Sequence, residues 1–303
     1  MGSLRVLITG CNGLLGCRLS KQLLASGYTV FGSSLRGLVN PYLSAENYLS
    51  ADLRLPGSAQ TLLDFCQPDI LVHAAAITKP DLAELNPADC FLSNTKATEM
   101  LLPETKKRGI RFIHLSTDFV FRGLAHSHPE TATDFPPCNV YGESKLQAET
   151  LVAQLDPKAC IIRTALVYGF EPLLPRSNIF TWALSELQAG RSIRVVDDQF
   201  RTPTYADDLA KGIERVCQQE FNGILNLAGP DWMSVYAFVQ AMAEVFGLDK
   251  SLILPVKTEV LNEPAKRPPN TRLIIQKAKT ELGYAPSSVH TCLHELKNSL
   301  SGN

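Results

Sequence analysis

Short runs of hydrophobic residues alternate along the chain with segments whose hydrophobic positions recur at helical spacing. The runs are continuous, which is typical of strands covered on both faces. We predict strands at 5–9, 28–31, 48–52, 70–74, 111–115, 159–164 and 224–228. We predict helices at 14–25, 59–66, 87–107, 141–154, 234–246 and 276–282. This alternation predicts an α/β fold with a doubly wound parallel sheet.

The order loosens after residue 165, and prolines punctuate the last third of the chain. We therefore predict a larger domain and a smaller C-terminal lobe. The larger domain takes residues 1–165 and about 203–229, and the smaller lobe takes about 166–202 and 230–303.

Composition excludes several classes of protein. Hydrophobic residues make up 45% of the 303 residues and charged residues 19%, which excludes a disordered chain. Basic and acidic residues number 29 and 30, which argues against nucleic acid as the main partner. We find no hydrophobic run long enough for a membrane span and no signal peptide, so we expect a cytoplasmic protein.

Cysteine and histidine patterns add little. The eight cysteines are scattered without a CxxC pair, which favours reduced thiols over a disulfide framework. The six histidines include no HExxH motif, and we predict no metal site.

A glycine loop, Gly10-Cys11-Asn12-Gly13-Leu14-Leu15-Gly16, joins the first predicted strand to the first helix. Glycines at this spacing allow a tight turn and the close approach of a pyrophosphate, which the helix N-terminus attracts. The loop predicts a Rossmann-type dinucleotide site, the alternative being a purely structural turn.

The end of the second strand bears on the choice of cofactor. Binders of NAD usually carry an acidic residue there, whereas this chain has Gly32-Ser33-Ser34-Leu35-Arg36. Ser33, Ser34 and Arg36 are suited to a 2′-phosphate, so we predict NADPH, with NADH as the alternative. The alternative for Arg36 is a solvated side chain on a loop that has no role in cofactor binding.

Tyr141 and Lys145 share one face of a predicted helix. A lysine near a tyrosine lowers the pKa of the phenol, which can then exchange a proton with a carbonyl as a hydride arrives. Upstream, Ser116 and Thr117 follow another strand, where ligands bind in open α/β folds. A surface pair of no catalytic role is the alternative for Tyr141 and Lys145.

Seven stretches of the sequence carry a resemblance to a known family: 10–16, 68–78, 116–121, 139–145, 163–169, 197–204 and 267–273. Over nearly its whole length the chain resembles an extended short-chain dehydrogenase/reductase, and more narrowly the dTDP-4-dehydrorhamnose reductase family. The glycine loop and the Tyr–Lys pair are shared by the superfamily, whereas the middle stretches are specific to this branch.

The resemblance implies a two-lobed enzyme that uses NADPH to reduce the 4-keto group of a nucleotide-activated 6-deoxysugar. It implies Tyr141 as proton donor, Lys145 as the residue that orients the ribose and lowers the tyrosine pKa, and Thr117 as the group that polarises the substrate oxygen. The expected cofactor-binding residues are Gly10, Asn12, Gly13, Leu14, Leu15, Gly16, Ser33, Ser34, Arg36, Asp52, Leu53, Ala74, Ala75, Ala76, Asn94, Ser116, Tyr141 and Lys145. The expected substrate-binding residues are Thr78, Asp118, Phe119, Gln199, Arg201, Thr202 and Arg267.

Two arginines of the smaller lobe have two interpretations each. Arg201 lies in a polar loop, where it contacts a substrate phosphate or only holds the loop. Arg267 precedes two prolines that stiffen its backbone, and it clamps a diphosphate or forms an interdomain salt bridge.

The chain departs from the family at two positions. Leu166 stands where members commonly have a tryptophan that packs on the sugar. The identity of the substrate sugar therefore stays open. Arg18 stands where some members have a glutamate for a magnesium-linked dimer contact, so we do not predict that metal. A homodimer stays open.

Two other functions fit the sequence. One is a non-catalytic NADP-binding regulatory subunit, because the chain also resembles the beta subunit of methionine adenosyltransferase. The other is an epimerase or another reductase of sugar nucleotides. A dehydratase is disfavoured, because Phe119 follows Asp118 where an acidic pair is usual.

Overall fold

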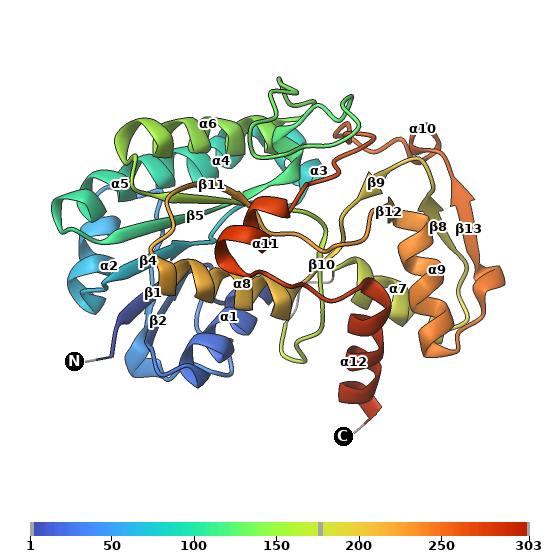
Figure 1. The fold of residues 1–303 in the computed structure, drawn as a ribbon, viewed down its shortest axis with the longest axis horizontal. Coiled ribbons are helices and arrows are strands. Elements are labelled where there is room, and N and C mark those ends of the chain that lie inside the picture. The colour runs from blue at the N-terminus through green and yellow to red at the C-terminus, as the bar shows by residue number, and fades with distance from the viewer. Residues whose placement is uncertain (1–2, 175–177, 302–303) are drawn as a thin grey trace.

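The computed structural model describes residues 3–174 and 178–301. Its central sheet has seven parallel strands in the order β11-β6-β5-β4-β1-β2-β3 (Figure 1). The strands are β1 (Arg5–Thr9), β2 (Thr29–Ser34), β3 (Tyr48–Ser50), β4 (Ile70–His73), β5 (Arg111–Thr117), β6 (Cys160–Thr164) and β11 (Gly223–Asn226). The prediction of an α/β fold with a Rossmann-type parallel sheet is confirmed.

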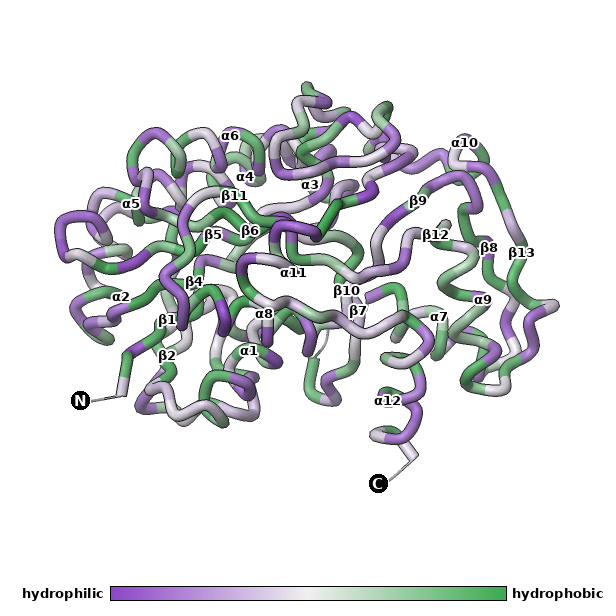
Figure 2. Tube along the Cα trace, in the orientation of Figure 1, coloured by the Kyte–Doolittle hydropathy of each residue, from purple (hydrophilic) through white to green (hydrophobic). Residues whose placement is uncertain are grey.

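Helices cover both faces of this sheet (Figure 1). One face carries α1 (Leu14–Ala25), α8 (Ala206–Gln219) and α11 (Gln276–Leu282); the other carries α2 (Ser58–Cys66), α5 (Ala97–Lys107) and α6 (Val140–Leu155). In β1, Val6 and Ile8 join the first core and Leu7 joins the second, because successive side chains point to opposite faces. Both sets are buried, which explains the hydrophobic strands visible in Figure 2.

The strand order has a switch point at β1. The chain runs outward from β1 to β2 and β3, then returns to β4 on the other side of β1. The connections after β1 and β4 therefore diverge, and this is where doubly wound folds bind ligands. The glycine loop and the ends of β2, β4 and β5 all lie at this carboxyl edge.

The smaller lobe has a hydrophobic core of its own. It contains α7 (Ile179–Gln188), α9 (Val235–Phe246), α10 (Thr258–Leu261) and α12 (Val289–Ser301). Its short strand pairs are β8 (Ile193–Val196) with β13 (Ile253–Val256), β9 (Phe200–Arg201) with β12 (Met233–Ser234), and β7 (Val167–Tyr168) with β10 (Thr204–Tyr205). Tyr205 packs in this core although its stretch is predicted to belong to the larger domain. Leu273, Ile275 and Ala278, from the stretch assigned to this lobe, pack in the core of the large sheet. The division into domains stays a prediction.

The predicted helix at 87–107 is interrupted. It consists of α4 (Pro87–Phe91), a π-helical turn η2 (Leu92–Lys96) and α5, and it is preceded by a further helix α3 (Pro80–Leu85). Asn94 lies within the turn and is fully buried, with its amide bonded to neighbouring segments. Hydrophobic periodicity does not reveal such a turn, because the buried face continues through it.

Helix α8 was missed by the sequence prediction although its pattern is clear. Leu209, Ile213 and Val216 recur at helical spacing and are buried against the sheet. Helices α7 and α12 were missed as well. The remaining short turns are η1 (Ala45–Asn47), η3 (Asp118–Val120) and η4 (Lys250–Leu252). Across the described ranges, every helix is too short or too polar to span a membrane.

Candidate active site

The glycine loop is tightly folded and packs closely against the segment that follows β4. Gly10 has a φ of +72°, and a Cβ there would lie 2.8 Å from the backbone nitrogen of Ala75. At Gly16 a Cβ would lie 2.5 Å from the Gly10 carbonyl oxygen. Gly13 precedes α1 and makes no side-chain cap, so the first N–H groups of the helix have no side-chain partner at the cap and are suited to an anion. Leu14 and Leu15 form the first turn of that helix.

The Asn12 side chain organises the loop after β2, and its contribution to cofactor binding stays a prediction. Its amide nitrogen donates to the Ser34 hydroxyl (2.7 Å) and to the Gly37 carbonyl (2.8 Å), and its amide oxygen accepts from the backbone of Val39 (3.1 Å) and Asn40 (3.2 Å). The loop that carries Arg36 is thereby tied to the glycine loop.

The three residues expected at the 2′-phosphate differ in their surroundings. Ser33 is buried, and its hydroxyl has no hydrogen-bond partner among the described residues. The Ser34 hydroxyl donates to the Arg36 carbonyl (2.9 Å) and lies 2.9 Å from the Tyr48 hydroxyl. The Arg36 side chain is exposed. The segment therefore offers one orphaned hydroxyl and one guanidinium at the end of β2.

The residues after β3 form a set of ion pairs at the carboxyl edge of the sheet. Asp52 accepts two hydrogen bonds from Arg54, at 2.8 and 2.7 Å, and Arg54 reaches on to Asp89 at 2.7 Å. The bond from Arg54 holds the pKa of Asp52 below its usual range. Leu53 is buried in the core beside them.

The segment after β4 runs beside the glycine loop. The Ala75 backbone N–H donates to the Thr9 hydroxyl (3.3 Å), while Ala76 is half-buried and Thr78 exposed. Asn94 holds the next turn: it accepts from the Ile77 N–H (2.8 Å) and donates to the Ile77 carbonyl (3.1 Å). Asn94 thus shapes the segment after β4, and its contribution to cofactor binding stays a prediction.

Helix α6 begins directly against the turn that follows β5. The Asn139 side chain caps it by accepting from the Gly142 N–H (2.8 Å). A Cβ on Gly142 would lie 2.2 Å from the Phe119 carbonyl oxygen, so only glycine permits this approach. The approach places Tyr141 beside Thr117, and the Phe119 ring lies edge-on to the Tyr141 ring at 5.8 Å.

Thr117, Tyr141 and Lys145 are all buried at this edge of the sheet. Burial raises the pKa of the Tyr141 phenol, a hydrogen bond with Thr117 opposes this, and the charge of Asp118 adds to it. Burial also lowers the pKa of Lys145 to about 8. The phenol is therefore protonated at neutral pH, and the ammonium is close to titrating.

His114 is a partner of Lys145 that the sequence analysis missed. Its Nε2 lies 3.1 Å from the Lys145 Nζ. Burial lowers the pKa of His114 well below its usual value, so the ring is neutral and Nε2 accepts from the ammonium. The residue shares a face of β5 with Ser116, whose buried hydroxyl has no partner among the described residues. The spacing of His114 and Ser116, two residues apart on one strand, could have indicated in the sequence that both side chains lie on the same face of β5.

Asp118 and Arg201 are buried together. Asp118 is 2% exposed and Arg201 3% exposed. The Arg201 Nε lies 3.7 Å from the Asp118 Oδ2, and its guanidinium lies 5.4 Å from the centre of the Phe119 ring. Gln199 accepts from Arg201 at 3.2 Å, and the buried Thr202 hydroxyl has no partner in the described part of the chain.

Arg267 forms ion pairs with two acidic groups. It donates to both Asp81 oxygens at 2.7 Å, and its Nε lies 3.3 Å from Glu263. Of the two interpretations, the structure shows a salt bridge, and the contact of Arg267 with a substrate diphosphate stays a prediction. Arg18 is similarly paired, with Asp207 and, at 3.5 Å, with Glu171. In residues 3–174 and 178–301 no group of three or more His, Cys, Asp or Glu is arranged to hold a metal ion.

Leu166 has a positive φ of 39°, uncommon for a leucine. It is half-buried against the core of the smaller lobe.

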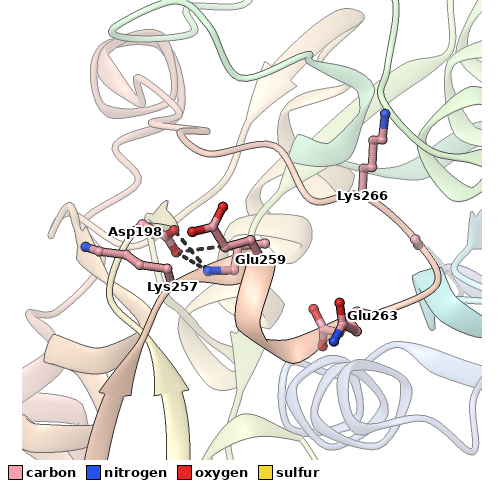
Figure 3. Close-up of a pocket in the computed structure, with 8 residues that line it drawn as sticks. Asp198, Lys257, Glu259, Glu263 and Lys266 are labelled. Atoms are coloured by element: carbon pink, nitrogen blue, oxygen red, sulfur yellow. Dashed lines mark hydrogen bonds between the residues drawn. The ribbon is translucent and has the colours of Figure 1, made fainter.

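A separate pocket of about 750 Å³ lies between the end of β13 and the segment leading to Arg267. In the wall of this pocket the Thr258 hydroxyl donates to the Asp198 carboxylate, and the Lys266 side chain points away from this pair (Figure 3).

Comparisons with known proteins match the fold and the motifs. The chain matches the family described as RmlD substrate binding domain over residues 4–301. It is 30% identical to the dTDP-4-dehydrorhamnose reductase of Burkholderia thailandensis, covering 92% of this chain and 93% of the relative. It is also 30% identical to the methionine adenosyltransferase 2 subunit beta of Danio rerio, covering 89% and 82%.

A crystal structure of dTDP-4-dehydrorhamnose reductase from Bacillus anthracis in complex with NADP superposes with a TM-score of 0.86. Its sequence is 25% identical, and the alignment covers 98% of this chain and 99% of that one. The resemblance inferred from the motifs is therefore confirmed: the chain belongs to the RmlD substrate binding domain family, within the extended short-chain dehydrogenases/reductases.

Proposed function

We propose that this protein is an NADPH-dependent oxidoreductase that reduces the 4-keto group of a nucleotide-activated 6-deoxysugar. One observation carries the proposal: Thr117, Tyr141 and Lys145 are buried at the carboxyl edge of the sheet, where the glycine loop also lies. The relative from Burkholderia and the NADP-bound neighbour support the reaction class.

The residues at the carboxyl edge of the sheet fit a dinucleotide phosphate. The uncapped N-terminus of α1 offers N–H groups to a pyrophosphate, and the glycines leave room that a side chain would fill. Ser33 supplies an orphaned hydroxyl and Arg36 a guanidinium for a 2′-phosphate. An acidic residue in this place would repel that phosphate, and the end of β2 has none.

NADPH, when bound, supplies the hydride. The protein's part is to hold and move a proton: Tyr141 is protonated at neutral pH and donates to the carbonyl oxygen as negative charge develops there. Thr117 orients that oxygen beside the phenol, and the Lys145 ammonium stabilises the phenolate left behind while holding the ribose. The buried setting strengthens each of these interactions.

The direct test supplies the substrate enzymatically. A dTDP-glucose 4,6-dehydratase and the matching epimerase convert dTDP-glucose to the 4-keto-6-deoxysugar, and NADPH absorbance is followed on adding this protein. We expect NADPH oxidation that depends on every component, with a control lacking the epimerase. Absence of oxidation with this sugar and its unepimerised precursor would contradict the proposal.

A regulatory subunit is the second candidate, and the Danio rerio relative favours it. In this role the protein would bind the nucleotide but act on a partner enzyme instead of on a sugar. The test mixes this protein with the catalytic subunit of a methionine adenosyltransferase and measures complex formation and synthetase rate. A stable complex together with inactivity in the reductase assay would favour this function over the first.

A further inference from the structure

The amide of Asn12 spends all its hydrogen-bonding capacity on the end of β2 and the loop after it. An asparagine amide has two protons to donate and two acceptor sites. In Asn12 the protons go to the Ser34 hydroxyl and the Gly37 carbonyl, and the oxygen accepts from the backbone N–H groups of Val39 and Asn40. A carbonyl can only accept and an N–H group can only donate, so the amide has a single orientation. The glycine loop is therefore joined to the loop after β2 at four points.

Asn40 completes the connection from the loop after β2. It is 3% exposed, and its amide nitrogen donates to the Cys11 carbonyl at 2.8 Å and to the Ser20 hydroxyl of α1 at 3.0 Å. Its amide oxygen accepts from the Tyr42 N–H at 3.0 Å. One amide thus reaches out from the glycine loop and the other reaches back to it. We call Asn12 and Asn40 the amide clamp.

The clamp holds the backbone that carries Arg36. The Ser34 hydroxyl accepts from Asn12 and donates its one proton to the Arg36 carbonyl at 2.9 Å. The Tyr48 hydroxyl, from β3, donates to the same carbonyl. The Arg36 side chain, by contrast, is exposed. The proton of Ser34 is thus used inside the protein, whereas the guanidinium of Arg36 stays available to a ligand.

A fixed backbone matters more for Arg36 than for the pyrophosphate site. An arginine on a mobile loop loses the freedom of the loop as well as its own when it binds a phosphate, whereas on a fixed loop it loses only its own. The glycine loop closes its turn without the clamp: the Gly13 N–H donates to the Gly10 carbonyl at 2.9 Å, and the Gly10 N–H donates to the Ser33 carbonyl at 2.7 Å. Loss of the clamp should therefore weaken a contact with a 2′-phosphate more than one with the pyrophosphate.

We propose that the amide clamp determines cofactor specificity: Asn12 and Asn40 fix the loop after β2 where Arg36 meets the 2′-phosphate of NADPH, and so favour NADPH over NADH. The inference rests on the dinucleotide site of the proposed function but not on the reduction that follows. Asn12 is then a positioning residue that acts on the cofactor through Arg36. Asn40 belongs to none of the motifs in the sequence and enters the site only through these contacts.

The test is a double-mutant cycle on cofactor binding with wild type, Asn12→Ala, Arg36→Met and the double variant. Fluorescence titration gives the selectivity ratio, which is the Kd for NADH divided by the Kd for NADPH. Asn12→Ala should lower this ratio about threefold, within the range of an exposed ion pair. Combined with Arg36→Met it should lower the ratio no further, because the group that the clamp positions is gone. A merely structural role of Asn12 would change both constants alike and leave the ratio in place.

A second variant reaches the same backbone from β3. Tyr48→Phe removes the hydroxyl that donates to the Arg36 carbonyl and keeps the ring, so the ratio should fall in the same direction. It decides the inference should Asn12→Ala not fold. The control is Ser50→Ala, which removes one exposed hydrogen bond to the Leu35 carbonyl of the same loop, at 3.3 Å. Water replaces that bond, so the control should keep the wild-type ratio.

The outcomes separate this inference from the proposed function. A wild-type ratio in Asn12→Ala, or a fall of the same size in the presence and absence of Arg36→Met, overturns the clamp. A wild-type ratio in Arg36→Met removes Arg36 from the 2′-phosphate site and overturns the inference with it. A protein that binds NADPH but oxidises none with the sugars tested overturns the reductase function instead. In that case the binding cycle still decides whether Asn12 acts through Arg36.

Discussion

The glycine loop and the group of residues around Tyr141 lie on the same edge of one sheet, but they are built differently. The loop is seven consecutive residues, 10–16, and it works through backbone N–H groups and the absence of side chains. The group around Tyr141 joins buried side chains from β5, α6, β9 and the segment at Thr271. The loop depends on local conformation, whereas the Tyr141 group depends on packing between segments that are distant in the sequence.

Tyr141→Phe is expected to have the largest effect. It removes the proton donor and keeps the ring that packs against Phe119, so kcat should fall by roughly 10²–10⁴-fold while NADPH still binds. Turnover is measured by NADPH absorbance and binding by fluorescence titration. Wild-type turnover would remove Tyr141 from the mechanism and leave only the loop as a functional site.

Gly16→Ala tests the backbone-built region. The new methyl would lie 2.5 Å from the Gly10 carbonyl oxygen, so the loop must shift. Overpacking of this kind costs about 1–3 kcal/mol, and we expect it as a lower Tm and weaker NADPH binding.

The matched control is Gly37→Ala, where a methyl meets nothing within 4 Å. Equal effects of the two substitutions would show that the close approach at Gly16 is not what shapes the loop.

His114→Leu probes the partner of Lys145. Loss of the acceptor leaves the buried ammonium less well solvated, so the pKa of Lys145, about 8 in the wild type, should fall. The ammonium is present below this pKa and lost above it. Activity that depends on the charge should therefore decline at a lower pH, with kcat at pH 8 down by roughly tenfold.

The kcat profile between pH 6 and 10 measures this shift. His114→Gln, which retains an acceptor, serves as the control and should keep the wild-type basic limb. A basic limb that stays in place in His114→Leu would show that His114 only fills space.

Arg36→Met is expected to have the smallest effect and bears on the loop alone. The side chain is exposed, so its interaction with a 2′-phosphate is screened. We expect the Kd for NADPH to rise about three- to tenfold and the Kd for NADH to stay constant. Equal changes for both cofactors would contradict the role given to Arg36.

Local sequence patterns are enough to predict the central sheet and the glycine loop. Hydrophobic runs mark strands that are buried on both faces, and the glycines stand between the first strand and its helix. Such features depend on residues close together in the chain, so local patterns reveal them. The motif residues Thr117, Tyr141 and Lys145 could also be selected, and their roles stay a prediction.

The contacts of these residues follow from the way distant segments pack together. The partners of Lys145 and Asp118 lie far away in the sequence: His114 is 31 residues from Lys145, and Thr271 is 153 residues from Asp118. The same holds for Arg267, whose partner Asp81 is 186 residues away in the sequence. Periodicity specifies which face of an element is buried, but not which distant polar group meets it there, because that depends on how the segments pack.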